Sequence, residues 1–329
     1  MTYLANKALL LCNTETTYNE GIGTTIPAGT PEETYAMLLT EIPTIEPVFT
    51  DLTNPEIHGG FSKVPSSGAS GTHWHFTFKF LLRPSGTNTA GTTDAPRSGP
   101  LFKASGHTLT TDVWTPDSAN ATGNGESLAF ILYLDGKKYI GTGGRCNLVI
   151  EGEAGDYVMC TADGYALYTE PTDEALPDVA AYGDSDPIIA RSVAFDFGTY
   201  DTEVVASKFT FDVGNQIEVD KSLNDSNGIG EIVITGRQTK LSIDPEMVAT
   251  STFNLYNSLT AGTQLTFTMT LGSGTDKVFT IATNTNGKVQ VANAPSPGAR
   301  TGKFAHDGLE FQFVAPVTDE DGDYKIEMS

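Results

Sequence analysis

Positive charge is scarce in this chain. Its 329 residues include 19 Lys and Arg against 41 Asp and Glu, which gives a formal net charge of −22. A surface that grips a phosphate backbone needs clustered cations, so the composition argues against a nucleic-acid-binding protein. It suits a surface that polyanions pass without adhering. Simple solubility is a commoner cause of acidic composition, and this explanation stays open.

Cysteine and long apolar runs are also rare. The three cysteines, Cys12, Cys146 and Cys160, form no CxxC pair and are expected to be reduced, buried thiols, with Cys146 and Cys160 as possible neighbours on adjacent strands. The first apolar run, Ala8–Cys12, is too short for a signal peptide, and no run approaches the roughly 18 residues of a membrane-spanning helix. We therefore expect a soluble protein that is made in the cytoplasm and has no membrane role.

Motifs of catalysis are missing as well. The sequence has no Gly-x-Ser-x-Gly elbow, no Walker loop and no HExxH motif. Carboxylates abound, but none can be assigned to an aromatic cleft. The sequence therefore predicts no catalytic residue and no cofactor, and the protein is expected not to be an enzyme.

Three short patterns could still hold a ligand. His73 and His75 share one face of a predicted strand, a spacing that suits zinc or copper, but no third ligand can be named and exposed strand histidines are favoured. Residues 319–323 (DEDGD) suggest a calcium loop, yet the glycine falls fourth rather than sixth, which favours an acidic turn. Residues 141–144 (GTGG) lie between strands, which favours a β-bulge over a dinucleotide loop. We predict no metal site.

Turn and strand formers are plentiful. The chain has 34 Gly and 17 Pro among many Thr, Val and Phe residues, which predicts many short strands. The clearest segment is 126–168, where Asp135-Gly136 separates two apolar runs as in a tight hairpin, and a second turn at Gly155-Asp156 extends a meander. Residues 128–134 are apolar on both faces, so this strand is expected to be packed on both sides, by a second layer or by a neighbouring subunit.

Further strands are expected on both sides of this segment. Residues 72–82 alternate between polar and aromatic side chains and predict a half-buried strand. Short helices are expected from a capping box at residues 30–33 through Leu39, at residues 100–105, and from Asp244 to about Leu259. Strands are expected over 4–14, 188–197, 202–213, 216–219, 229–235, 263–271, 277–282, 288–291, 309–314 and 324–328.

The chain divides best at an acidic stretch. Residues 170–187 hold six acids and no basic residue. We therefore predict a mostly β protein of two antiparallel β-sandwich or barrel units in tandem, each with a short flanking helix: 1–170, an acidic linker over 171–187, and 188–329. The second unit resembles the first in pattern, though not closely in residues.

These segments carry a resemblance to a known family. Residues 7–18 (KALLLCNTETTY), the central YLDG of 133–136 with GGRCNLVIEGEAG of 143–155, and DGY of 163–165 resemble a major tail (tail tube) protein of a long-tailed, siphovirus-like bacteriophage. The later FDVGN of 211–215, GR of 236–237, and DG pairs at 307–308 and 321–322 are also similar. Cys146 departs from the small or polar residue more usual after the Gly-Arg pair, and the second β unit makes the chain longer than single-domain tube proteins.

The resemblance implies a structural virion protein located in the tail. In that family, β-sandwich subunits contribute strands to a barrel around a channel, and rings stack into the tube through which DNA is ejected. The implied partners are further copies of the chain, the tape measure, tail terminator and baseplate proteins, and DNA in transit. Two tube-type units imply trimeric rings with pseudo-sixfold symmetry, whereas a decorating second unit implies hexamers. The loop 85–98 is our candidate for ring stacking.

Two other function classes remain. A capsid decoration or adhesin-like β-sandwich protein of a virion or cell surface would be a monomer or a small closed oligomer. A carbohydrate-active or metal-binding β-sandwich enzyme would need an aromatic and carboxylate site, or a third ligand beside His73 and His75.

Overall fold

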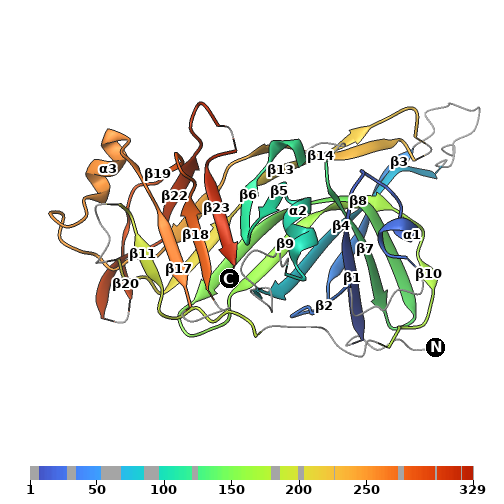
Figure 1. Cartoon of the computed structure of the whole chain (residues 1–329), viewed down its shortest axis with the longest axis horizontal. Coiled ribbons are helices and arrows are strands. Elements are labelled where there is room, and N and C mark those ends of the chain that lie inside the picture. Colours follow the sequence, from blue (N-terminus) through green and yellow to red (C-terminus); the bar gives the residue numbers. More distant parts are fainter. Residues whose placement is uncertain are drawn as a thin grey trace, which may run out of the picture.

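The computed structural model describes residues 7–27, 35–52, 68–84, 96–120, 125–178, 186–198, 204–225, 227–272, 278–300, 302–319 and 321–328. Antiparallel strands dominate it, with a few short helices between them (Figure 1). The predicted mostly β, antiparallel class is confirmed. The sheets remain open and do not close into a barrel within the described part of the chain.

The first part of the chain supplies ten strands and two α-helices. They are β1 (Ala8–Glu15), α1 (Ile22–Thr25), β2 (Ala36–Met37), β3 (Thr44–Leu52), β4 (Gly68–Leu81), α2 (Gly99–Ala104), β5 (His107–Thr110), β6 (Val113–Pro116), the 3₁₀ helix η2 (Ser118–Asn120), β7 (Ser127–Leu134), β8 (Lys137–Glu153), β9 (Met159–Tyr168) and β10 (Thr172–Asp173).

The rest of the chain continues in the same style. Its elements are β11 (Ala194–Asp196), β12 (Lys208–Asp212), β13 (Asn215–Lys221), β14 (Ile229–Arg237), β15 (Lys240–Ile243), α3 (Leu255–Ala261), β16 (Gln264–Leu265), β17 (Thr268–Leu271), β18 (Phe279–Thr283), β19 (Lys288–Val291), β20 (Pro297–Arg300), β21 (Lys303–His306), β22 (Leu309–Val314) and β23 (Tyr324–Met328).

One long sheet joins both parts of the chain. Its strands can be followed in the order β3-β4-β9-β8-β12-β15-β22-β19-β16. Strand β8 makes this possible because it is 17 residues long. One edge of β8 pairs with β9, while the other edge pairs first with β7 and then, near its end, with β12. We call this nine-strand path the long sheet.

A second layer covers one face of the long sheet. Under its first strands, Phe76 and Phe78 of β4 each pack edge-on against Phe130 of β7, with ring centroids 5.3 Å apart. Under its later strands lies a six-stranded sheet in the order β11-β17-β18-β23-β6-β5, and Phe197 packs on Phe311 at 4.7 Å. The apolar side chains of both layers form one continuous core.

Strand β7 is packed on both faces, as its sequence predicts. Leu128, Phe130 and Leu132 belong to the main core. Ile131 and Tyr133 face the other way and join a separate cluster with β1, Ala36 and Ile26, just after helix α1. The long sheet covers one face and the residues around α1 and β2 cover the other, so elements of the same chain account for both apolar faces.

Segments cross between the two parts of the chain. Strands β5 and β6 extend the six-stranded sheet through β23, where Trp114 lies opposite Ile326. In return, the β13–β14 hairpin contacts β8, β9 and β4. The division into 1–170, 171–187 and 188–329 therefore stays a prediction, with residues 179–185 of the linker outside the described residues.

The positions predicted for two helices are wrong. Ala36 and Met37 form strand β2 rather than a helix, because pairing with Leu11 and Leu10 buries both residues; the capping box at 30–33 lies outside the described residues. Helix α3 starts at Leu255 instead of Asp244. The Asp244 carboxylate accepts hydrogen bonds from the amides of Ser207 and Lys208 at 2.7 and 2.9 Å, so it ties β12 to the end of β15.

Cys146 and Cys160 lie on adjacent strands, as predicted, but they are not the cross-strand neighbours that the sequence left possible. Cys146 lies opposite Gly164, and Cys160 lies opposite Ile150, so the two thiols are offset along β8 and β9. All three cysteines are buried and free, and burial raises the pKa of each thiol, that of Cys12 to about 12. They act as small apolar side chains, as predicted.

The predicted turns are confirmed. Asp135 and Gly136 have φ values of 38° and 100°, so both central residues of the hairpin are left-handed, as a primed turn requires. Gly155 has φ 88° in the second turn. The predicted helical turn at 100–105 corresponds to α2, and predicted strands 288–291, 309–314 and 324–328 match β19, β22 and β23.

Candidate functional site

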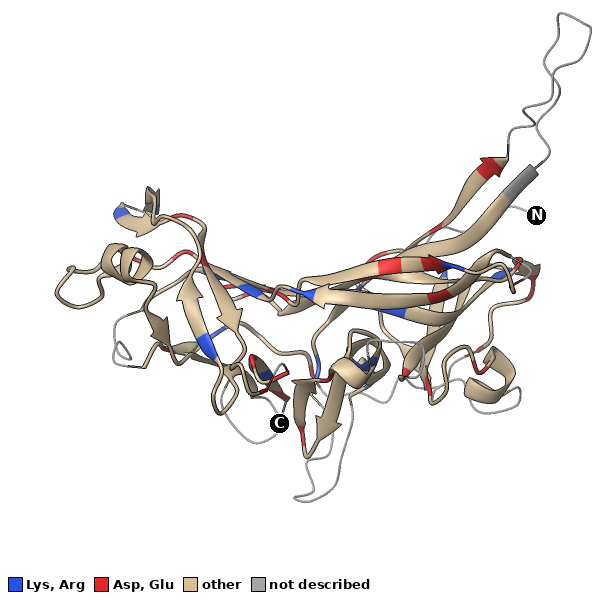
Figure 2. Ribbon diagram, turned by 90° about the horizontal axis from the view of Figure 1, so that it is seen from above, with Lys and Arg blue, Asp and Glu red and all other residues tan. Residues whose placement is uncertain are grey.

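The long sheet has an uncovered polar face. Along β4, the aromatic side chains of Trp74, Phe76, Phe78 and Phe80 are buried, while the alternate side chains point away from the core. This is the half-buried alternation that the sequence predicts. Seen from above, the long strands run as one layer, with the C-terminus on one side of it (Figure 2). We call the uncovered side the open face.

Cross-strand partners make the open face continuous. Directly opposite residues in antiparallel strands share a face, so the strand registers trace rows across the sheet. One row crosses eight strands from β4 to β16 and contains Lys79, Thr161, Val149, Asp212, Lys240, Gln312, Gln290 and Gln264. The next row contains Leu81, Met159, Glu151, Thr210, Ser242 and Glu310. The open face is therefore one surface built from both parts of the chain.

Charges on the open face are mixed, with few unbalanced cations. Among the described residues it carries six carboxylates and four lysines: Glu46, Glu151, Glu153, Asp163, Asp212 and Glu310, and Lys79, Lys208, Lys240 and Lys288. Lys79 lies 3.1 Å from Glu41, and Lys240 lies 3.7 Å from Glu310. Lys208 lies opposite Glu153. Three of the four lysines thus have an acidic neighbour.

The two predicted histidines lie on the open face but do not gather ligands. His75 contacts Asp163 through Nε2 at 3.0 Å, and Thr77 donates a hydrogen bond to the same carboxylate oxygen at 2.7 Å. Tyr165 packs beside both imidazoles, with centroids 5.4 and 5.2 Å from those of His73 and His75. No group of three metal-ligating side chains occurs among the described residues. These contacts fit the interpretation that His73 and His75 are exposed histidines on a strand and not metal ligands.

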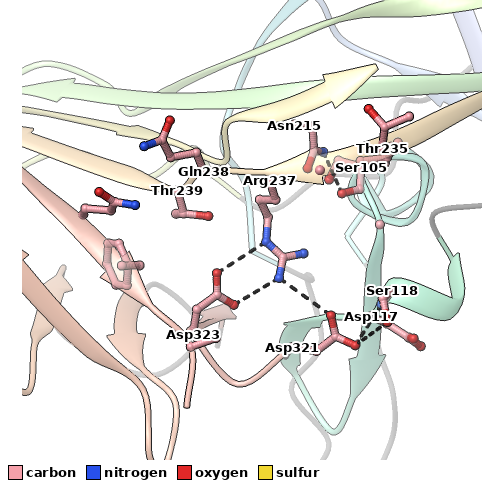
Figure 3. Close-up of a pocket in the computed structure, with 16 residues that line it drawn as sticks. Ser105, Asp117, Ser118, Asn215, Thr235, Arg237, Gln238, Thr239, Asp321 and Asp323 are labelled. Carbon is pink, nitrogen blue, oxygen red and sulfur yellow. Dashed lines mark hydrogen bonds and ion pairs between the residues drawn. The ribbon is translucent and has the colours of Figure 1, made fainter. Parts of the chain in front are cut away.

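A pocket of about 360 Å³ lies behind the β13–β14 hairpin (Figure 3). Arg237 at its centre contacts Asp323 at 3.2 Å and Asp321 at 3.7 Å. Asp321 also accepts hydrogen bonds from the amide and hydroxyl of Ser118, both at 2.9 Å. Burial raises the pKa of Asp323, although Arg237 beside it acts in the opposite direction. These pairs connect β14, η2 and the turn before β23.

The acidic turn at 319–323 is used by this network. Asp321 and Asp323 face Arg237, whose guanidinium occupies the position where a cation would be expected, and Glu320 lies outside the described residues. The predicted acidic turn fits this arrangement better than a calcium loop does. Arg237, Asp321 and Asp323 are therefore paired with other protein groups, and the network has a structural role.

The glycines at 141–144 form the predicted bulge. The register of β8 shifts between Thr142 and Arg145 on β9, and Gly143 has φ 59°. A Cβ on Gly143 would lie 2.8 Å from the Tyr18 ring, so the position needs glycine for space as well as for φ.

A buried polar cluster beside the bulge is a feature that the sequence pattern does not reveal. The Glu15 carboxylate accepts hydrogen bonds from Ser127 Oγ at 2.6 Å and from the Gly143 amide at 2.7 Å. Arg145 is fully buried and donates to the carbonyls of Glu126 and Gly125. Burial raises the pKa of Glu15 and lowers that of Arg145. The cluster fixes where β1, β7 and β8 meet.

None of the described helices combines the length and apolar character that crossing a bilayer would require. Among curated proteins, none matches this chain. A family model described as phage tail tube protein matches residues 7–315, which is nearly the whole chain and includes every strand of the long sheet. The chain therefore belongs to the phage tail tube protein family.

Proposed function

We propose that copies of this chain polymerise into rings that stack into the phage tail tube, with the open face lining the channel. The observation that carries the proposal is the long sheet, which has one face in the core and one open polar face, and whose end strands β3 and β16 each pair with a single strand within the described part of the chain. Exposed strand edges invite pairing with another chain, and a closed barrel removes them. A ring of copies would close the long sheet in this way.

We further propose three chains in each ring, with pseudo-sixfold symmetry. The long sheet contains two four-strand groups with the same order relative to the chain: β3-β4-β9-β8 and β12-β15-β22-β19. In each group the first two strands in chain order are neighbours (β3-β4 or β12-β15), and a helix follows the second strand (α2 or α3). The fourth strand in chain order (β9 or β22) lies between the second strand and the third (β8 or β19). This repetition supports two tandem tube-type units, 1–170 and 188–329, and hence six quasi-equivalent groups in a trimer.

The channel surface would repel DNA only mildly but would offer it few binding sites. The described open face has a small excess of carboxylates over lysines, and three lysines lie beside or opposite acids. DNA binding releases counterions when free cations contact phosphates, so neutralised lysines gain little from such contact. The acidic lining that we predict thus rests on a modest local excess as well as on the net charge of −22.

Stacking and tail assembly need surfaces beyond the ring. The β3–β4 hairpin projects from the body of the protein (Figure 2) and is the described segment best placed to reach an adjacent ring. The loop 85–98 stays a candidate, although residues 85–95 lie outside the described residues. The tape measure protein would occupy the channel, and the terminator and baseplate proteins would bind the two ends of the tube.

Electron microscopy of the purified protein at high concentration tests the proposal. Hollow tubes or stacked rings are the expected result, and threefold density with sixfold pseudo-symmetry would support the tandem arrangement. Sixfold rings would instead assign the second unit to decoration. Particles that stay monomeric, even when mixed with tail initiation proteins, would contradict the proposal and favour a decoration or adhesin-like protein.

A further inference from the structure

We propose, on the basis of the ring just described, that β3 of one copy pairs with the β20 end of the next copy. The contact would repeat between chains the β12–β8 junction that exists within one chain. The acidic segment 38–52 would then face the basic β20–β21 hairpin. The argument uses the repetition in the fold, the exposed edges and the distribution of charge.

The junction within the chain supplies the geometry. Strand β12 pairs antiparallel with the last residues of β8, from Lys208 opposite Glu153 to Asp212 opposite Val149. This part of β8 lies next to the turn that leads into β9, beyond the residues that pair with β7. Strand β12, which begins the second group, thus pairs with the end of β8 that lies next to the β8–β9 turn.

The same site is open at the other end of the long sheet. In the second group, β19 and β22 correspond to β8 and β9, and β20 and β21 form the distal part of their hairpin. Strand β16 pairs with only Val289 and Gln290 of β19. The edge beyond them leads into Pro297–Arg300 of β20, for which the described residues provide a partner only in β21.

Strand β3 is the element that would fill this site. It corresponds to β12, and among the described strands its partner is β4. Eight of its nine residues are exposed, including Val48 at 39%, Phe49 at 51% and Leu52 at 45%. Pro47 is tolerated because edge strands do not need every amide donor. Such a long exposed edge with apolar side chains favours association with another chain.

Charge distinguishes the two surfaces. Residues 35–52 contain Glu41, Glu46 and Asp51 and no Lys or Arg. Residues 297–306 contain Arg300 and Lys303 and no acid, in a chain where acids outnumber bases two to one. Asp244 and Glu246 contact Arg300 at 3.3 and 2.8 Å, and Glu246 contacts Lys303 at 2.9 Å, yet 66% of the Lys303 side chain is exposed, and Phe304 next to it is 71% exposed. The surfaces are complementary in charge, and each carries an exposed aromatic ring.

Position also fits a head-to-tail contact. Strands β3 and β20 lie at opposite ends of the long axis of the molecule (Figure 1). A contact between different surfaces closes into a ring when the rotation between copies is a simple fraction of a turn. The neighbour is therefore a second copy of the same chain.

Crosslinking tests the contact directly. The variant Phe49→Cys/Phe304→Cys places one thiol on each surface, and the three native cysteines are buried. A short bis-maleimide should convert its rings into covalent dimers and trimers. Each single variant, and the pair Leu223→Cys/Phe304→Cys with its more exposed thiol at the β13–β14 loop, should give background only.

Charge reversal gives an independent readout. Lys303→Glu should lower the fraction of protein in rings about tenfold at low salt. Adding Glu46→Lys and Asp51→Lys should restore it, while the matched change Lys325→Glu, on the outward side of β23, should have no effect. Rings that form normally in Lys303→Glu and do not crosslink through positions 49 and 304 would overturn this contact and leave the ring proposal intact. Failure of the unaltered chain to form rings, even when mixed with tail initiation proteins, would overturn both.

Discussion

Asn227 and Thr72 are 155 residues apart in sequence, yet they form a reciprocal pair of hydrogen bonds. The Thr72 amide donates to Asn227 Oδ1 at 3.2 Å, and Asn227 Nδ2 donates to the Thr72 carbonyl. Gly71 adds a third bond, from its amide to the Asn227 carbonyl at 3.1 Å. A loop residue of the β13–β14 hairpin thus holds the base of β4, and with it the projecting β3–β4 hairpin.

Asn227→Ala should therefore loosen the hairpin from the sheet. The substitution removes two hydrogen bonds and leaves the Thr72 amide without its side-chain partner, so the free energy of unfolding should fall by about 1–2 kcal/mol. Urea unfolding measures the change. Asn224→Ala in the same loop, where the side chain is exposed, should stay within about 0.5 kcal/mol of the parent. Equal effects of the two substitutions would contradict the role of Asn227.

Acid should destabilise the fold through His107. This imidazole is fully buried, contacts Tyr324 Oη through Nε2 at 2.7 Å and Ser105 Oγ through Nδ1 at 2.7 Å, and burial lowers its pKa from 6.5 to about 3. The unfolded chain takes up a proton below pH 6.5, whereas the folded chain does so only near pH 3. Stability from this group is therefore complete above pH 6.5 and is lost as the pH falls towards 3, by about 2 kcal/mol at pH 5.

Comparing the parent with His107→Gln isolates that contribution. The variant should be less stable at pH 7, because one buried hydrogen bond is altered, but its unfolding free energy should decline less between pH 6.5 and pH 4. Chemical denaturation over this range gives both curves. Parallel curves would show that His107 does not carry the pH dependence.

Gly164→Ala should disrupt the centre of the long sheet. A Cβ at this position would lie 2.1 Å from the Arg145 carbonyl oxygen and 2.7 Å from the Cys146 Cα, and backbone atoms cannot move aside as a flexible side chain can. We expect a loss of about 3 kcal/mol or more, visible as a lower midpoint in thermal unfolding. Gly23→Ala, with open space around its Cβ and helical backbone, should leave the midpoint unchanged or raise it slightly.

Free cations on the open face should make assembled tubes adhere to DNA. Thr161→Lys/Thr210→Lys adds two lysines in neighbouring rows of this face without removing an acid. Filter binding of labelled single-stranded DNA to assembled tubes should show retention that falls steeply with salt, while unaltered tubes should retain little. Two lysines added at Thr270 and Thr280, in the other sheet, provide the control. Equal retention by both double variants would argue against the open face as the channel wall.

Local patterns in the sequence were enough to locate most strands. The alternation at 72–82, the Asp135-Gly136 turn and the apolar run 128–134 each depend on neighbouring residues, because strand periodicity and left-handed turn residues are local properties. The resemblance to tail tube proteins rested on the same turn-rich segments, and the family match confirms it. The helix predicted to reach Leu39 is wrong at Ala36 and Met37, because pairing with β1 buries both residues in a strand.

Only the tertiary structure decided how the strands share one sheet. Nothing local in β8 shows that its first residues pair with β7 and its last with β12, since ladder hydrogen bonds form between segments far apart in the chain. The same holds for Arg145 and Glu15, whose burial depends on Gly125, Ser127 and the bulge at Gly143. The sequence by itself determined most of the strands and turns and the acidity of the chain. The packing of those strands determined the open face and the two unequal edges, because faces and edges exist only once distant strands are paired.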